Sequence, residues 1–267
     1  GGSGIGNSWT DAGSSIETIQ SMVVYNGHLY VGHSVSVGEA DVWEFNGSQW
    51  RQIGGDAINN SWAAAIYEGV YSMTAFNSKL YAGLGSGAND AEVWEYAASS
   101  TSWKKVGGDG TNGSWSASYD TVRSLQSFNG KLYAGIGDTA GDAEVWEYNG
   151  DIWTQIAGDG SNGSWTEAGS AYEEVFSMTV FNGRLYAGLG ITGDGDLWEY
   201  NGSTWEQIGG DGLNLSWNTG YDTVRSLYAF NGKLYAGLGD STGEAEVWEY
   251  NNYSTMFAKN GPAGISI

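Results

Sequence analysis

The sequence predicts an all-β fold, a five-bladed β-propeller with four antiparallel strands in each blade, from three repeated features. Val-Trp-Glu-Tyr or a close variant places a tryptophan at 43, 94, 146, 198 and 248. Leu-Tyr-x-Gly begins at 29, 80, 132, 185 and 234, and Ser-Trp places a tryptophan at 9, 62, 115, 165 and 217. The three features keep one register with a period of about 52 residues, a length typical of propeller repeats. We therefore expect a single propeller domain over residues 1–267, with blades at about 9–58, 59–111, 112–161, 162–213 and 214–267.

Each repeat contains four short segments of strand-like composition. In the third repeat we expect strands over 122–128, 131–135, 143–148 and 153–156, because these segments are rich in β-branched and aromatic residues. Asn-Gly pairs at 129–130 and 149–150 separate them, and both residues tolerate the positive φ of a tight turn. One four-stranded sheet cannot bury both of its own faces. Radial stacking of neighbouring blades solves this problem.

The composition excludes several classes of function. The net charge is −21, which opposes the binding of nucleic acid and of anionic lipid. No segment approaches 18 consecutive apolar residues, so we expect no membrane insertion. Cysteine is absent, which excludes disulfides and thiol chemistry and fits extracellular and intracellular settings equally. The chain starts at Gly1 without a signal peptide, and we expect a processed or excised form, with a secreted or cell-surface location slightly favoured.

The loop GGDGxNxSW, between the last strand of one blade and the first strand of the next, is the candidate ligand-binding element. A tryptophan face beside Asp and Asn offers a sugar a flat apolar platform and oriented hydrogen-bonding groups. The alternative is structural: Asp and Asn form a turn, and the tryptophan fills the seam between blades. With the tyrosine that follows each loop, the candidate ligand-binding residues are Asp56, Asn59, Trp62, Tyr67, Asp109, Asn112, Trp115, Tyr119, Asp159, Asn162, Trp165, Tyr172, Asp211, Asn214, Trp217 and Tyr221.

The first blade departs from this loop pattern. Ser3 replaces the aspartate, Gly6 replaces the asparagine, and Ile16 stands in place of the tyrosine. We expect four competent sites and a weak or absent one near the termini. The last blade is degraded as well, with Phe257 at the tryptophan position, so we expect the junction of blades 5 and 1 to open first.

Metal and cofactor sites are not predicted. A calcium loop of the EF-hand kind needs oxygen ligands at alternate positions and a final bidentate Glu, and Asp-Gly-x-Asn-x-Ser lacks both features. The histidines, His28 and His33, both lie in the first blade, and His28 stands where other blades carry Lys or Arg. We therefore interpret His28 as a charged surface residue, and expect no metal and no cofactor.

Two further positions recur in every repeat. A glutamate follows the Val-Trp tryptophan, and we expect it to pair with the basic residue that precedes Leu-Tyr on the adjacent strand. The glutamates are Glu44, Glu95, Glu147, Glu199 and Glu249, and the basic residues are Lys79, Lys131, Arg184 and Lys233. The second position varies, with Gln20, Tyr71, Arg123, Phe176 and Arg225. If first strands line the axis, Arg123 and Arg225 would suit an anion in the channel.

The unit from Phe181 to Ile208, FNGRLYAGLG…DLWEYNGSTWEQI, resembles a kelch-type blade. It has the glycine-ended second strand, a third strand that ends in Tyr, and a second Trp seven residues after the first. It departs from that family in having Gly-x-Gly, as at Gly83 and Gly85, where kelch units carry a double Gly, and kelch rings usually have six or seven blades. The loop VGGDGTNGSWSASYDTVRSL is similar in layout to the loops of tachylectin-type five-bladed lectins, which implies one N-acetylated amino sugar per blade.

These observations favour a multivalent carbohydrate-binding propeller without catalytic activity. Repetition of one site raises avidity without tight single sites. The first alternative is a structural or protein-interaction propeller, so the expected partners are glycans or a protein, and we expect a monomer. A five-bladed glycoside hydrolase is less favoured, because its acids need distinct roles and this chain has little asymmetry. The low divergence of the repeats would also fit a reconstructed sequence selected for folding.

Overall fold

The computed structural model describes residues 5, 8–9, 18–34, 40–63, 67–85, 90–116, 118–165, 172–191, 193–218, 220–239, 241–251 and 256–259. Over these residues the chain is all-β, with strands β1 to β20 joined by tight turns and short 3-10 helices, and without an α-helix. No helix in the described part of the chain is long and apolar enough to cross a membrane.

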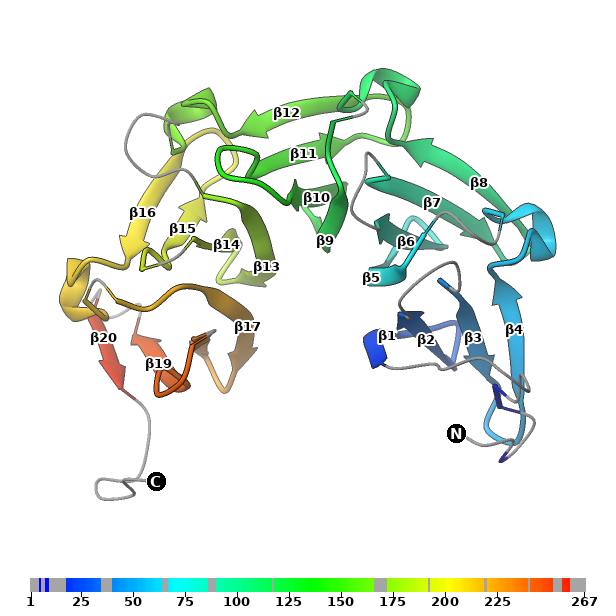
Figure 1. Cartoon of the computed structure of the whole chain (residues 1–267), viewed down its shortest axis with the longest axis horizontal. Helices are drawn as coiled ribbons and strands as arrows, with labels where there is room; N and C mark the ends of the chain where they lie inside the picture. The colour runs from blue at the N-terminus through cyan, green and yellow to red at the C-terminus, as the bar shows by residue number, and fades with distance from the viewer. Residues whose placement is uncertain are drawn as a thin grey trace. The chain divides into compact units, whose positions relative to one another are not determined.

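The strands follow one another as antiparallel sets of four, which we number 1 to 5 along the chain (Figure 1). Set 1 contains β1 (Thr18–Tyr25), β2 (His28–Ser34), β3 (Val42–Phe45) and β4 (Trp50–Gly54), paired in this order. Set 2 repeats the arrangement with β5 (Gly69–Phe76), β6 (Lys79–Gly85), β7 (Glu92–Ala97) and β8 (Ser102–Gly107).

The remaining sets follow the same order. Set 3 contains β9 (Thr121–Phe128), β10 (Lys131–Gly137), β11 (Glu144–Tyr148) and β12 (Trp153–Ala157). Set 4 contains β13 (Glu174–Phe181), β14 (Arg184–Gly190), β15 (Leu197–Tyr200) and β16 (Trp205–Gly209). Set 5 contains β17 (Val224–Phe230), β18 (Lys233–Leu238), β19 (Glu246–Asn251) and β20 (Met256–Lys259).

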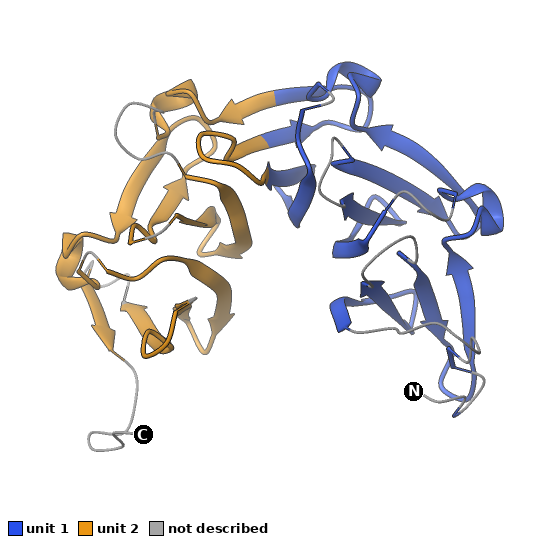
Figure 2. Cartoon of the chain, viewed as in Figure 1, with its two compact units in different colours: residues 1–136, 146–154 blue, residues 137–145, 155–267 orange. Residues whose placement is uncertain are grey.

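The chain divides into two compact units (Figure 2). Unit 1 comprises residues 1–136 and 146–154, and unit 2 comprises residues 137–145 and 155–267. Unit 1 therefore holds sets 1 and 2 entire, and unit 2 holds sets 4 and 5 entire. The division passes through set 3, so each unit is described by itself.

Within each unit, consecutive sets meet where a second strand ends beside the next first strand. In unit 1, Ser34 pairs with Gly69 and Gly85 pairs with Thr121. In unit 2, Gly190 pairs with Thr223 at the equivalent place. The first-strand serine then bonds forward: Ser72 Oγ donates to the carbonyl oxygen of Val122 at 3.0 Å. One repeated contact thus fixes how each set lies against its successor.

A glycine in each second strand allows this close approach. A Cβ on Gly83 would lie 2.4 Å from Ser72 Oγ and 2.7 Å from a methyl carbon of Val122 in the next set. Real Cβ atoms do not approach this closely, so a larger residue would push the two sets apart. The glycine that ends Leu-Tyr-x-Gly therefore has a packing role.

The Asn-Gly turn at 129–130 forms as predicted, whereas at 149–150 only Gly150 has a positive φ, and Asn149 Oδ1 accepts hydrogen bonds from the backbone N–H groups of Asp151 and Ile152. Asn129 and Gly130 join β9 to β10 with φ angles of +47° and +71°, which any residue with a large side chain adopts only at a cost. The strands of set 3 lie within two residues of the predicted bounds at every end.

The predicted pairs between glutamate and base are confirmed. Glu95 Oε1 lies 2.6 Å from Lys79 Nζ, and Glu95 Oε2 accepts a hydrogen bond of 2.8 Å from the Tyr81 hydroxyl. The same pairs recur as Lys131–Glu147, Arg184–Glu199 and Lys233–Glu249. His28 takes the place of the base in set 1, at 2.8 Å from Glu44, as the sequence predicted for a surface residue. This glutamate is a structural residue that links the second and third strands of a set.

The variable first-strand position lies at a β-bulge. Register shifts occur between Val70 and Ser72 and at the equivalent places in β1, β13 and β17. The guanidinium carbon of Arg123 lies 4.6 Å from the ring centre of Tyr71, and Arg225 stands in the same relation to Phe176 at 4.9 Å. Side chains at this position therefore contact one another between consecutive sets within each unit, as cation–π pairs.

Set 1 and set 5 each carry an apolar face that is exposed where the equivalent positions of other sets are buried. On β1, Met22 is 65% exposed, whereas Met73 at the same position of β5 is 8% exposed. On β17, Phe230 is 56% exposed, whereas Phe181 of β13 is 5% exposed. A Cβ on Gly237 would touch only its own set, unlike one on Gly83.

Candidate functional site in the repeated loops

The candidate loops share one backbone conformation. Each contains a single 3-10 turn: η2 (Ile58–Asn60), η3 (Thr111–Gly113), η4 (Ser161–Gly163) and η5 (Leu213–Leu215). The loop aspartates have φ of +52° to +53°, and the loop asparagines have φ of +53° to +55°. Asp and Asn tolerate the left-handed region better than other residues with a side chain, because a short polar side chain can bond locally. The residue choice at these positions therefore follows from the turn.

The loop asparagines bond back to the strand before the loop. Asn112 Nδ2 donates to the carbonyl oxygen of Val106 at 3.0 Å, and Asn59, Asn162 and Asn214 make the same bond with Ile53, Ile156 and Ile208. The serine before the tryptophan accepts from the backbone, as Ser114 Oγ does from Gly108 N at 2.8 Å. These bonds make the loop rigid without any ligand.

The loop tryptophans are buried in the seam between consecutive sets. Trp62, Trp115, Trp165 and Trp217 are only 2–5% exposed. Trp62 donates a hydrogen bond of 2.6 Å to the carbonyl oxygen of Ala40 in set 1, and its ring meets the edges of Trp94 and Trp103 in set 2. The ring faces are covered, so these tryptophans support the loop from beneath.

The fourth-strand tryptophans reinforce the same seam. Trp103 Nε1 donates to the carbonyl oxygen of Ile53 in the preceding set at 2.7 Å. Trp153 bonds to Val106, and Trp205 bonds to Ile156, in the same way. Phe257 fills this position in set 5 and has no indole nitrogen to donate.

The loop aspartates are the exposed members of the candidate site. Asp56, Asp109, Asp159 and Asp211 all lie at the surface. Asp109 Oδ2 lies 2.6 Å from Lys105 Nζ, and Asp56 accepts a long bond of 3.4 Å from Gln52. The carboxylates at the loop surface are therefore available to a ligand, whereas the rings beneath are not.

The structure groups the candidate residues differently from the sequence. We expected each loop aspartate to act with the tyrosine that follows it. Instead, Tyr67 donates a hydrogen bond to Glu92, whose carboxylate also pairs with Lys105 beside Asp109. Tyr172 likewise donates to Asp196, near Asp211. Each cluster thus joins the tyrosine after one loop to the aspartate of the next loop.

The sequence analysis missed the acid at the centre of each cluster. It stands two residues before the Val-Trp tryptophan, as Asp41, Glu92, Glu144, Asp196 and Glu246. Its recurrence in all five repeats was the available signal. Burial raises the pKa of Tyr67, and the hydrogen bond to Glu92 raises it further. Burial, followed by the hydrogen bond to Glu246, raises the pKa of Tyr221 to about 12.

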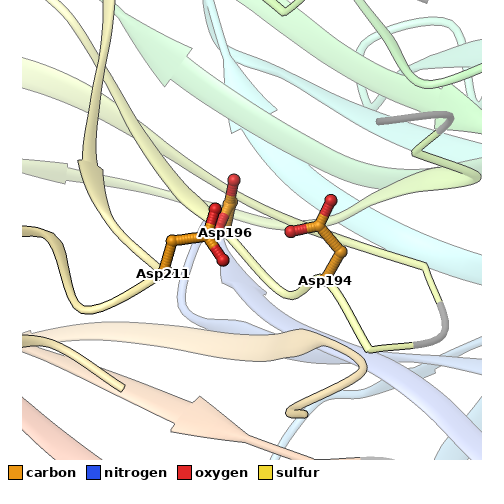
Figure 3. Close-up of side chains that lie close together, drawn as sticks. All are labelled: Asp194, Asp196 and Asp211. Carbon is orange, nitrogen blue, oxygen red and sulfur yellow. The ribbon is translucent and has the colours of Figure 1, made fainter. Parts of the chain in front are cut away.

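In set 4 three carboxylates come close together. Ligand oxygens of Asp194, Asp196 and Asp211 lie within 4.8 Å of one another (Figure 3). Burial raises the pKa of Asp196 to about 7, with further contributions from the charges of Asp194 and Asp211. Over the described residues, no other group of three such side chains lies close enough to hold a metal ion.

The three residues at which the first loop differs from the other four, Ser3, Gly6 and Ile16, lie outside the described residues. Trp9 is described, and its ring meets His33, Trp43 and Trp50 edge-on. Trp9 therefore packs on set 1 as Trp62 packs on set 2.

The sequence matches no known family model and no curated protein sequence. Solved structures are similar in fold alone. A nidogen/laminin complex matches with a TM-score of 0.54 at 10% identity, over 92% of this chain and 81% of that chain. The Niastella koreensis GH74 enzyme matches with a TM-score of 0.58 at 10% identity, over 90% of this chain but only 38% of that chain. U3-55K matches with a TM-score of 0.54 at 10% identity, over 93% of this chain and 82% of that chain.

These likenesses support a β-propeller fold. The nidogen and GH74 structures are β-propeller proteins, and they align with this chain over nine-tenths of its length. Identities of 10% carry no argument about activity or ligand.

Proposed function

We propose that the five sets are the blades of one closed five-bladed propeller that binds carbohydrate at several equivalent loops and has no catalytic activity. The domain then comprises residues 1–267, as expected from the five repeats. The observation that supports the binding role most strongly is the repetition of an exposed aspartate on the same rigid turn in four loops.

The exposed faces of set 1 and set 5 support closure. Inside each unit, the first strand of one set lies against the preceding set. Its valine meets the glycine in the second strand of that preceding set, as Val122 meets Gly83. Set 1 lacks a predecessor, and set 5 lacks a successor. In a closed ring the two exposed faces cover each other, and Ile19 takes the place that Val122 has beside Gly83. Burial of such apolar surface contributes about 25 cal/mol per Å².

A carbohydrate ligand suits the surface that the loops present. Carboxylates held in fixed positions accept hydrogen bonds from hydroxyl pairs, and such bonds to a charged group are stronger than those to a neutral one. The loop layout resembles that of the tachylectin-type lectins, which implies one sugar per blade. The tryptophans act in this proposal by holding the loop rigid, and a preformed loop loses little conformational entropy on binding.

The arrangement of the acids supports a role without catalysis. A glycosidase needs a proton donor that reaches the scissile bond and a second carboxylate in a different role. Asp196, the acid with the raised pKa, is 2% exposed and bonded to Tyr172 and Gln207. A substrate on the loop surface would not reach it, and the exposed loop aspartates are equivalent to one another.

A protein partner is the second candidate. The similar structures include a nidogen/laminin complex and, separately, a GH74 enzyme. The fold is therefore compatible with a protein ligand as well as with a carbohydrate ligand. Rigid loops with exposed carboxylates would suit a protein ligand as well.

A glycan-array screen tests the proposal, with variants chosen on the surface of the loops. Trp→Ala variants would disturb the seam, so the informative variant carries Asp56→Asn, Asp109→Asn, Asp159→Asn and Asp211→Asn together. Asparagine tolerates the same positive φ, so the loops keep their shape. A matched control changes two exposed acids elsewhere, Asp151→Asn and Glu206→Gln.

We expect selective glycan binding by the wild type and the control, and its loss in the loop variant. Binding that survives in the loop variant would place the site elsewhere. A blank array from the folded wild type would favour the protein-interaction alternative.

A further inference from the structure

Three carboxylates converge at one end of set 4. Asp194 and Asp196 precede β15, and Asp211 lies in the loop after β16. Each offers one oxygen atom within 4.8 Å of the others. Figure 3 shows Asp194 and Asp211 on either side of Asp196, with their carboxyl groups extended toward it.

Asp196 carries a buried oxygen atom without a partner. The residue is 2% exposed, and its Oδ2 accepts hydrogen bonds from Tyr172 and from Gln207 Nε2, the latter at 2.7 Å. Its Oδ1 has no hydrogen-bond partner and lies 1.7 Å from where a Cβ on Gly210 would stand. The free oxygen therefore faces the backbone that leads into Asp211. A buried carboxylate oxygen without a partner destabilises the fold unless something satisfies it.

The equivalent clusters of sets 2 and 5 supply their own cation, whereas sets 1 and 3 have Gln52 and Gln155 at the lysine position. In set 2, Lys105 Nζ pairs with both Glu92 and Asp109, and Glu92 also accepts from the Trp94 indole at 2.7 Å. In set 5, Lys259 pairs with Glu246. Set 4 has the neutral Gln207 at the lysine position.

Set 4 also has a shorter acid. Asp196 replaces the glutamate of sets 2, 3 and 5, as Asp41 does in set 1. Trp198 Nε1 is equivalent to the donor on Trp94 and is buried without a partner, like Trp43 Nε1 in set 1. What distinguishes set 4 is that its three carboxylates lie close together, at a place without a lysine and with buried polar atoms that have no partner.

We propose that Asp194, Asp196 and Asp211 bind one divalent cation of the calcium type. Carboxylate oxygens are the ligands that calcium prefers, at about 2.3–2.6 Å, so two oxygens on one ion lie at most about 5 Å apart. The observed limit of 4.8 Å fits this requirement. The cluster contains no histidine, and the chain has no cysteine, so zinc and copper are disfavoured. Water completes the coordination, because Asp211 lies at the surface.

This site shares Asp211 with one of the proposed carbohydrate sites, but it needs no sugar, so calcium binding is measured separately from carbohydrate binding. Isothermal titration of the metal-free protein with CaCl₂, in the absence of sugar, tests it directly. Asp211→Asn is the informative variant, since Asp211 is exposed and Asn tolerates its φ of +52°. Asp159→Asn is the matched control, because it makes the same change at the same loop position of set 3. Thermal unfolding with and without CaCl₂ provides a second measurement.

We expect one calcium ion per chain, a raised Tm in calcium, and affinity weakened on the order of tenfold or more in Asp211→Asn but not in Asp159→Asn. The proposal is overturned if the wild type shows neither heat nor a Tm shift at about 1 mM calcium, the weak end of protein sites. Calcium affinity weakened equally in Asp211→Asn and Asp159→Asn would also overturn the proposal, because it would reflect the general surface charge and not a site at Asp211. Tighter binding of Mg²⁺ than of Ca²⁺ would contradict the calcium type.

Discussion

The indole nitrogen of Trp115 lies 2.7 Å from the carbonyl oxygen of Ala91, 24 residues earlier in the chain. Trp115 follows the loop after set 2, and its ring meets Trp146 and Trp153 of set 3 edge-on. One side chain thus joins the loop to the sets on both of its sides. The same bond recurs at Trp62, Trp165 and Trp217.

The first prediction concerns this bond. Trp115→Phe keeps much of the ring packing but leaves the carbonyl of Ala91 without its donor, and we expect a loss of about 1–3 kcal/mol in the free energy of unfolding. Trp115→Ala removes the ring as well, and we expect a loss of about 3–5 kcal/mol. Urea denaturation followed by far-UV circular dichroism measures both. If Trp115→Phe unfolds at the wild-type midpoint, the seam bond does not stabilise the fold.

The second prediction concerns His33. Both ring nitrogens of His33 are buried without a partner, and burial lowers its pKa to about 4 from the ordinary 6.5. The other sets carry Leu84, Ile136, Leu189 and Leu238 at this position. The unfolded chain binds a proton on His33 below about pH 6.5, whereas the folded chain does so only below about pH 4. His33 therefore makes the fold less stable as the pH falls through this window.

His33→Leu removes this effect. We expect the stability difference between His33→Leu and the wild type to grow by about 2 kcal/mol between pH 7 and pH 5. Denaturation at the two pH values measures it. His28→Lys, which restores the base of the other sets on the surface, is the control and should keep the acid-dependent loss of the wild type. A stability difference independent of pH would show that His33 takes up a proton equally in the folded and unfolded chain.

The third prediction concerns ring closure. Met22 and Met73 occupy the same position in sets 1 and 2. If the ring closes, Met22→Gln buries an amide and costs about as much as Met73→Gln, on the order of 1–3 kcal/mol. Urea denaturation of the two variants in parallel makes the comparison. A cost for Met73→Gln alone would show that the face of set 1 is open to water.

The strands were predictable because their signals are local. Asn129-Gly130 fixes a turn by its φ preferences, and the residues from Val122 to Phe128 carry β-forming side chains. The pair of Lys79 and Glu95 was predictable from its recurrence at one spacing. Repetition turned weak local signals into reliable ones.

The grouping of the site residues was not predictable, because it depends on contacts between sets. Nothing in the sequence near Tyr67 shows that its hydroxyl meets Glu92, 25 residues later, and not Asp56. The orientation of Trp62 likewise depends on Ala40 in one set and Trp94 in another. The chemistry of tryptophan suits a sugar platform, but whether a tryptophan ring is exposed depends on the packing of neighbouring sets.

The stoichiometry of binding tests the central claim of repeated sites most directly. A glycan that binds on the array is titrated calorimetrically into the wild type and into Asp159→Asn, which leaves the other three loop aspartates intact. We predict saturation near four sugars per chain, from the loops with Asp56, Asp109, Asp159 and Asp211, and one fewer in the variant. Saturation at a single sugar, unchanged in Asp159→Asn, would contradict the account.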